Sequence, residues 1–171
     1  MAEISATDVM KLRNQTGLSM MECKRALAEA AGNFEKAEDI LRKSMKGKMD
    51  AKTDRPAGAG RVAIATGGGA GSIVEVRAET DFTAINDKFV AAVQNIADLA
   101  LKQPTGAAGT VAAFPEATKI VDELRITTGE NCSYARGRKL EGGGGKTFGS
   151  YVHHDGKTGA LVVAEGDISS E

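Results

Sequence analysis

Apolar residues recur at helical spacing through the first part of the chain, and residues that favour helix ends interrupt them at short intervals. Ser5 or Thr7 can cap a first helix, and Asn33 can cap a third. Between them, Ser19 can cap a second helix, and Glu22 has the spacing of a capping box with it. The apolar stripes that these caps introduce are Val9 and Leu12, then Met20, Cys23 and Leu27, then Phe34, Ala37, Ile40 and Leu41. Residues 1–45 are therefore predicted to form a compact three-helix bundle.

The apolar pattern changes after the bundle. Residues 46–60 have no usable periodicity and carry charges, a proline and glycines, which predicts a linker. Two alternating segments, RVAIAT and SIVEVRAE, then flank GGGAG and predict a β-hairpin. Asn86 can cap a helix with an apolar stripe, and a second helix begins near Pro115 and stops near Gly129.

Three further strand candidates complete the chain: NCSYARGRKLE, TFGSYVHH and GALVVAEG, with the turns GGGGK and DGKT between them. The order of strand, strand, helix, helix and three strands is typical of an α+β domain with an antiparallel sheet. The predicted fold class is thus α+β, with the helical bundle followed by an α+β core over residues 61–171.

Phe82 stands where the second alternating segment gives way to helical spacing, and two interpretations follow. Its spacing to Ile85 and Phe89 would make it the first member of the core stripe, which spacing alone favours. Thr80 and Asp81, however, are good capping and turn residues, so the chain is expected to bend at Phe82. On that second interpretation the ring lies on a corner from which it projects outward.

The composition narrows the classes of function. A formal net charge of −1 argues against nucleic acid as the default partner. Cys23 and Cys132 lack CxxC spacing, so we expect reduced, buried thiols and neither a disulfide nor a zinc site. The chain starts without a secretory signal and has no apolar run of membrane-spanning length, which predicts a soluble cytoplasmic protein with no membrane partner.

Two motifs suggest enzyme chemistry, and neither is complete. GGGGKT resembles the end of a phosphate-binding loop, but Leu140 stands where the first glycine is needed and a strand is predicted to follow. In the second GKT, Tyr151 occupies the equivalent position, so both are interpreted as hairpin turns. His153 and His154 are neighbours on a predicted strand, would point to opposite faces and would not share a metal. With no nucleophile–base arrangement visible, a binding protein is favoured over an enzyme.

Four stretches, in order, resemble the elongation factor Ts family. TGLSMMECKRALAEAAGNFEKAEDILRK resembles its N-terminal module, a ubiquitin-associated-like three-helix bundle. EVRAETDFTAINDKF resembles the family's core motif, in which a strand ends in Thr-Asp-Phe before a helix. TTGENCSYAR and GSYVHHDGKTGALVVAEG resemble its Gly-Glu-Asn segment and its Gly-Ser-Tyr-x-His strand.

The resemblance implies a guanine nucleotide exchange factor for the GTPase elongation factor Tu, without a cofactor, metal or catalytic residue of its own. It implies that the bundle contacts the partner's G domain. It also implies that the Thr-Asp-Phe loop enters the partner beside its magnesium site, with Phe as a wedge and Asp helping to rearrange the metal's surroundings. The matching positions are Thr80, Asp81, Phe82 and Thr83. Further partner contacts implied by the resemblance are Lys24, Thr128, Gly129 and His153.

The chain also departs from the family pattern. Longer members have a second half of the core and an inserted helical hairpin, so this is expected to be a short member or a C-terminally incomplete chain. Short members act as homodimers, which implies pairing through the sheet domain. Thr83 and Thr128 stand where apolar residues are common, which would weaken partner contact. The alternatives are a ubiquitin-associated-like adaptor without exchange activity and a phosphate-binding nucleotide hydrolase.

Overall fold

The computed structural model describes residues 4–142 and 146–166. The chain forms two compact units. The first contains the chain up to Asp54 together with Arg125–Gly129, and the second contains Arg55–Leu124 and the chain from Glu130 onward. The fold is α+β with antiparallel strands, as predicted. None of the helices in the described ranges has both the length and the apolar character needed to cross a membrane.

The first unit contains the three predicted helices: α1 (Ala6–Thr16), α2 (Met20–Glu29) and α3 (Phe34–Asp50). Their caps are those expected from the sequence. Ser5 caps α1, Ser19 and Glu22 form the reciprocal capping box of α2, and Asn33 caps α3. The side chains buried where these helices meet include Leu12, Cys23 and Leu27. The ubiquitin-associated-like character of this bundle stays a prediction.

The end of the bundle differs from expectation. α3 continues to Asp50, so the first five residues of the expected linker are helical, and β1 already begins at Ala59. Met45 and Met49 are buried one and two turns after Leu41, which extends the apolar stripe of α3. Two lysines and a glycine lie between the two methionines, so the sequence shows no clear apolar periodicity here.

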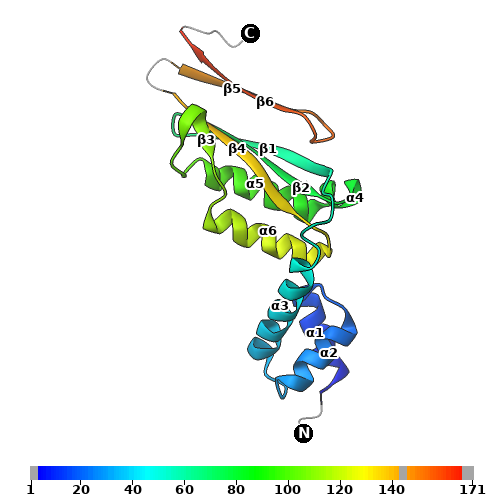
Figure 1. The fold of residues 1–171 in the computed structure, drawn as a ribbon. Coiled ribbons are helices and arrows are strands. Elements are labelled where there is room, and N and C mark those ends of the chain that lie inside the picture. Colours follow the sequence, from blue (N-terminus) through cyan, green and yellow to red (C-terminus); the bar gives the residue numbers. More distant parts are fainter. Residues whose placement is uncertain (1–3, 143–145, 167–171) are drawn as a thin grey trace. The chain divides into compact units, whose positions relative to one another are not determined.

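The second unit is built on a four-stranded antiparallel sheet in the order β1-β2-β4-β3 (Figure 1). Its strands are β1 (Ala59–Gly67), β2 (Ala70–Ala78), β3 (Thr110–Val111) and β4 (Ser133–Glu141). The predicted β1–β2 hairpin is present, and its turn places Gly68 and Gly69 at positive φ, 58° and 74°. Glycine adopts this conformation without steric cost, which explains the glycine cluster between the strands.

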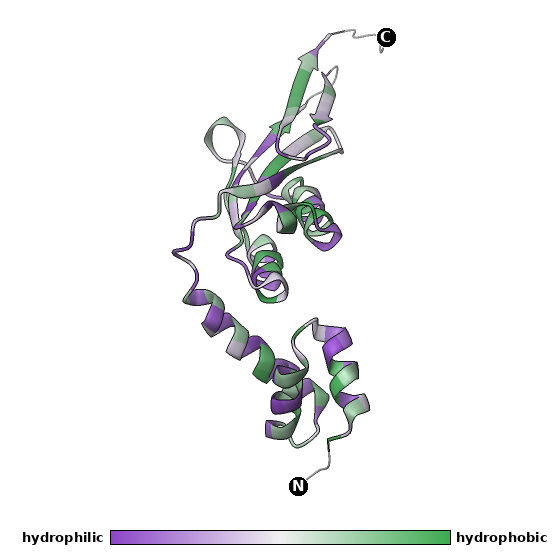
Figure 2. Ribbon diagram, turned by 90° about the vertical axis from the view of Figure 1, so that its right-hand side faces the viewer, coloured by the Kyte–Doolittle hydropathy of each residue, from purple (hydrophilic) through white to green (hydrophobic). Residues whose placement is uncertain are grey.

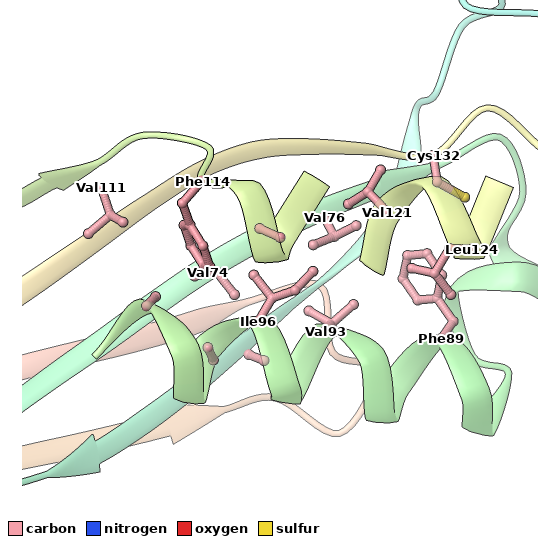
Figure 3. Packing of buried hydrophobic residues seen from close by; sticks show 14 of the residues in the cluster. Val74, Val76, Phe89, Val93, Ile96, Val111, Phe114, Val121, Leu124 and Cys132 are labelled. Carbon is pink, nitrogen blue, oxygen red and sulfur yellow. The ribbon is translucent and has the colours of Figure 1, made fainter. Parts of the chain in front are cut away.

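Two helices, α5 (Asp87–Ala100) and α6 (Pro115–Thr128), cover one face of this sheet. Asn86 caps α5 and Pro115 opens α6, as expected. Figure 3 shows the core between helices and strands, whose labelled members are Val74, Val76, Phe89, Val93, Ile96, Val111, Phe114, Val121, Leu124 and Cys132. Cys23 and Cys132 are both buried, as predicted.

The last two strands, β5 (Lys146–Val152) and β6 (Gly159–Glu165), form a separate two-stranded sheet on the other face (Figure 1). β6 is largely hydrophobic (Figure 2). A Cβ atom added to Gly71 of β2 would lie 2.9 Å from Leu161 and 3.1 Å from Phe148, so the hairpin packs closely over a glycine.

The prediction that the GGGGK segment is a hairpin turn is wrong in the described part of the chain. β4 is hydrogen-bonded to β2 and, at Gly137 and Arg138, to β3, whereas the described residues of β5 pair with β6 in a different sheet. The chain instead passes from one sheet to the other. Gly143–Gly145, at the centre of this segment, lie outside the described residues.

Candidate functional site

Phe82 lies in a single helical turn, α4 (Asp81–Ala84), at the corner between β2 and α5. Its side chain is 85% exposed, and Ile85 is 61% exposed. The buried stripe therefore starts at Phe89, and the interpretation of Phe82 as a core residue is wrong. Thr80 caps the turn, because its hydroxyl accepts a hydrogen bond from the Thr83 amide at 3.3 Å. This cap stops β2 and turns the chain outward, so the ring projects from the corner.

A reciprocal pair of carboxylate contacts fixes the start of this turn. Thr80 donates from its hydroxyl to Glu130 Oε1 at 2.6 Å and from its amide to Glu130 Oε2 at 3.1 Å. In the other direction, the Asn131 amide donates to Glu79 Oε1 at 2.7 Å. Hydrogen bonds to charged groups are stronger than those between neutral groups. These bonds therefore hold residues 79–80 in place against residues 130–131, fifty positions later in the chain.

Asp81 is held by a different element. The ammonium group of Lys157, in the turn between β5 and β6, lies 2.9 Å from Asp81 Oδ1. The hydrogen bond and charge of Asp81 raise the pKa of the Lys157 side chain. Both side chains are largely exposed, so the pair orients Asp81 more than it stabilises the fold. It also brings the β5–β6 turn beside the Phe82 corner.

His153 lies at the start of that turn, and the Tyr151 hydroxyl is 2.7 Å from its Nδ1 atom. The prediction that His153 and His154 point to opposite faces is wrong, because β5 ends at Val152 and both rings follow it. Their centroids are only 4.2 Å apart. Across the described residues, no group of three potential metal ligands occurs.

The remaining predicted contacts lie in the first unit. Lys24 is exposed on α2. Met20 and Met21, one turn earlier, are 42% and 75% exposed, so Met20 does not belong to the buried stripe where the sequence pattern placed it. Thr128 is the last residue of α6, and Gly129 ends the helix with φ of 72° and an amide hydrogen bond to the Arg125 carbonyl at 3.0 Å.

The structure thus brings Asp81, Phe82 and the turn that carries His153 together in one unit, while Lys24 belongs to the other. Sequence reasoning missed Glu130 and Lys157, which hold the corner. In the sequence, Glu130 lies within the Gly-Glu-Asn segment and Lys157 within the second, incomplete GKT motif. No local pattern links either residue to positions 80–82.

The hydrolase interpretation loses its structural basis. A phosphate-binding loop is followed by a helix whose N-terminus faces the anion. Here Lys146 and Thr147 are the first residues of strand β5, and Lys157 lies in a strand-connecting turn where it pairs with Asp81. Neither Gly-Lys-Thr segment precedes a helix in the described ranges.

Comparison with known proteins places this geometry in context. The model of the family described as Elongation factor TS matches residues 79–171, just over half of the chain. The chain is 39% identical over 174 residues to an elongation factor Ts of Lactiplantibacillus plantarum, covering 99% of this chain and 60% of that protein. With the elongation factor Ts of Maricaulis maris the identity is 43%, covering 97% of this chain and 55% of that protein.

A third relative, the elongation factor Ts of Thiobacillus denitrificans, is 40% identical over 98% of this chain and 59% of its own length. The chain therefore spans between half and three fifths of the length of these curated relatives. The family match begins at Glu79, so it includes the whole Phe82 corner, Glu130 and the β5–β6 turn. On these grounds the chain belongs to the elongation factor Ts family.

Proposed function

We propose that the chain is a guanine nucleotide exchange factor that binds elongation factor Tu in its GDP form and promotes GDP release during translation elongation in the cytoplasm. The observation that carries the proposal is the exposed ring of Phe82 on a corner held from two sides. Membership of the elongation factor Ts family supports it. The exposed corner is a suitable shape for insertion into another protein.

The proposed mechanism rests on linkage. A protein that binds the nucleotide-free GTPase more tightly than the GDP-bound form weakens GDP binding by the same factor. Mg²⁺ neutralises much of the charge on the GDP phosphates, so disturbing its coordination weakens retention of the nucleotide. Burial of one aromatic ring contributes about 1.5–3 kcal/mol, which offsets part of the cost of opening the partner. No covalent bond is made or broken in this process.

The residues fall into proposed roles. Phe82 acts as the wedge, Asp81 faces the partner's magnesium surroundings, and Thr80 and Thr83 complete the contact. Additional proposed contacts with elongation factor Tu are Lys24, which would touch its G domain, and Thr128, Gly129 and His153. We also propose that the chain pairs into a homodimer. Light scattering tests this, because a dimer would have twice the molar mass of the chain.

Release of a fluorescent GDP analogue from elongation factor Tu tests the function directly. Stopped-flow mixing with the chain at micromolar concentration is expected to accelerate release, in proportion to concentration until the partner saturates. Unchanged release, together with retained folding by circular dichroism, would contradict the exchange function. Binding to elongation factor Tu without accelerated release would instead favour an adaptor.

A further inference from the structure

Four cationic side chains line a hollow of about 250 Å³ beside the Phe82 corner. They are Arg61 of β1, Arg77 of β2, Arg136 of β4 and Lys157 of the β5–β6 turn. The acidic residues of the lining are Glu75 and Asp81, so four positive and two negative groups leave a formal charge of +2. The whole chain carries a formal charge of −1, so this is a local concentration of positive charge.

Glu75 organises two of these cations. Its Oε1 accepts from Arg77 Nε at 2.8 Å, and its Oε2 accepts from Arg136 Nε at 2.6 Å. Burial opposes ionisation of Glu75, but these two hydrogen bonds outweigh it and lower the pKa of the carboxyl. A guanidinium group has five N–H donors, and only the Nε donor of each arginine is used here among the described residues. The side chains of Arg77 and Arg136 are 49% and 79% exposed, so their terminal N–H groups can reach a ligand.

The hollow adjoins the Phe82 corner through Asp81, which lines it and precedes Phe82 in the chain. A protein that buries the Phe82 ring therefore also covers the edge of this hollow. Covering cations without matching negative charge carries a large desolvation penalty. The surface that covers them must bring anions, and the planar guanidinium fork matches the geometry of a carboxylate.

We infer that the hollow receives carboxylate side chains from an acidic patch on the protein that binds Phe82. The inference rests on the proposed function and adds the chemistry of the partner's surface. Attraction between the two patches accelerates association and orients the partner before the ring inserts. The local positive charge thus raises the rate of association with the partner, whereas Phe82 raises the rate of nucleotide release from the complex.

The first test uses the double variant Arg77→Gln and Arg136→Gln in the full chain. We expect the second-order rate constant for stimulated GDP release to fall roughly threefold to tenfold at low ionic strength, because attraction between charges raises association rates. Its dependence on salt should also weaken, while the maximum rate at saturation stays unchanged. The matched control, Lys102→Gln and Lys119→Gln, removes two exposed charges outside the hollow and should change neither quantity. An unchanged second-order constant and salt dependence in the arginine variant would overturn the inference.

The second test does not depend on exchange activity. The arginine side-chain resonances of the ¹⁵N-labelled chain are followed during titration with hexaglutamate, inorganic phosphate or a single-stranded deoxythymidine decamer. The inference predicts saturable shifts of Arg61, Arg77 and Arg136 with hexaglutamate at lower concentration than with phosphate. Equal or tighter binding of phosphate or the decamer would overturn the assignment to carboxylates. If exchange fails but hexaglutamate binds at these arginines, the proposed function is wrong and the carboxylate site stands.

Discussion

The hydroxyl of Thr80 donates a 2.6 Å hydrogen bond to the carboxylate of Glu130, and the Thr80 amide donates to the second oxygen of the same group. Thr80 also caps the helical turn that carries Phe82. One carboxylate therefore fixes the residue that sets the direction of the exposed ring. The orientation of Phe82 thus depends on a residue from another part of the chain.

Removing the Thr80 hydroxyl tests this dependence. Thr80→Val keeps the shape of the side chain but loses both the hydrogen bond to Glu130 and the cap, whereas Thr80→Ser keeps the hydroxyl. A hydrogen bond to a charged group contributes about 1.5–3 kcal/mol. We expect Thr80→Val to slow stimulated GDP release by about tenfold or more, while Thr80→Ser stays near the parent rate. Equal rates for the two variants would show that the hydroxyl does not position the ring.

Phe82→Ala is expected to slow stimulated GDP release by roughly tenfold to a hundredfold, since burial of the ring contributes about 1.5–3 kcal/mol. The melting temperature should hardly change, because the side chain is already 85% exposed. Val162→Ala, at a side chain that is 56% exposed on β6, provides the matched control for loss of exposed apolar surface. Severe unfolding of Phe82→Ala, or an equal loss of exchange in Val162→Ala, would contradict the wedge.

Phe89→Ala should behave in the opposite way to Phe82→Ala. Phe89 is fully buried in the core between α5, α6 and the sheet. Truncation of a buried phenylalanine costs about 3–5 kcal/mol, because apolar contacts are lost and a cavity is left. Urea denaturation should show a loss of this size. A decrease in the free energy of unfolding below about 1 kcal/mol would mean that α5 does not pack against the sheet as described.

Ser72→Ala tests a buried polar contact. The Ser72 hydroxyl is inaccessible to solvent and donates to the Ala97 carbonyl at 2.6 Å, which joins β2 to α5. Losing the bond is expected to lower the free energy of unfolding by about 1–2 kcal/mol, without a change in the exchange rate. Urea denaturation measures the first quantity and GDP release the second. No change in stability would rule out a stabilising role for this contact.

Acid titration tests the capping box of α2. Hydrogen bonds from Lys48 and Ser19 outweigh the effect of burial and lower the pKa of Glu22 below 4.5. The ionised carboxylate therefore stabilises the fold above this pH, and the contribution is lost as the pH falls through the lowered value. Glu22→Gln should reduce stability by about 0.5–1 kcal/mol at pH 7 and by much less near pH 3. Glu29→Gln, exposed in the same helix, is the control. An equal loss for Glu22→Gln at both pH values would show that its charge contributes nothing.

Features that depend on neighbours in the chain could be predicted from the sequence. Ser5, Ser19, Asn33 and Asn86 cap the expected helices, and a glycine turn joins the expected β1–β2 hairpin. A capping side chain reaches only two or three residues ahead, so its signal is contained in a short window. The same local range explains why α3 was underestimated, since a glycine and lysines separate its last buried methionines.

The candidate site was predictable only in part. Thr80 and Asp81 indicated a bend, but spacing alone favoured a buried Phe82. The helical spacing of apolar residues does not reveal that a separately capped turn precedes the helix. The contacts that settle the orientation come from Glu130 and Lys157, on segments distant in the sequence. The paired histidine rings were also mispredicted, because β5 ends one residue before them.

By itself, the sequence determined the local elements, the α+β class and the resemblance to one family, because caps, periodicity and motifs act over a few residues. Tertiary structure decided that β5 and β6 form their own sheet over Gly71 and that a ring of uncertain orientation stands 85% exposed. It also gathered the cations beside that ring from three strands and a turn. Such contacts depend on which strand edges are already paired and which side chains meet after folding, and no local pattern carries that information.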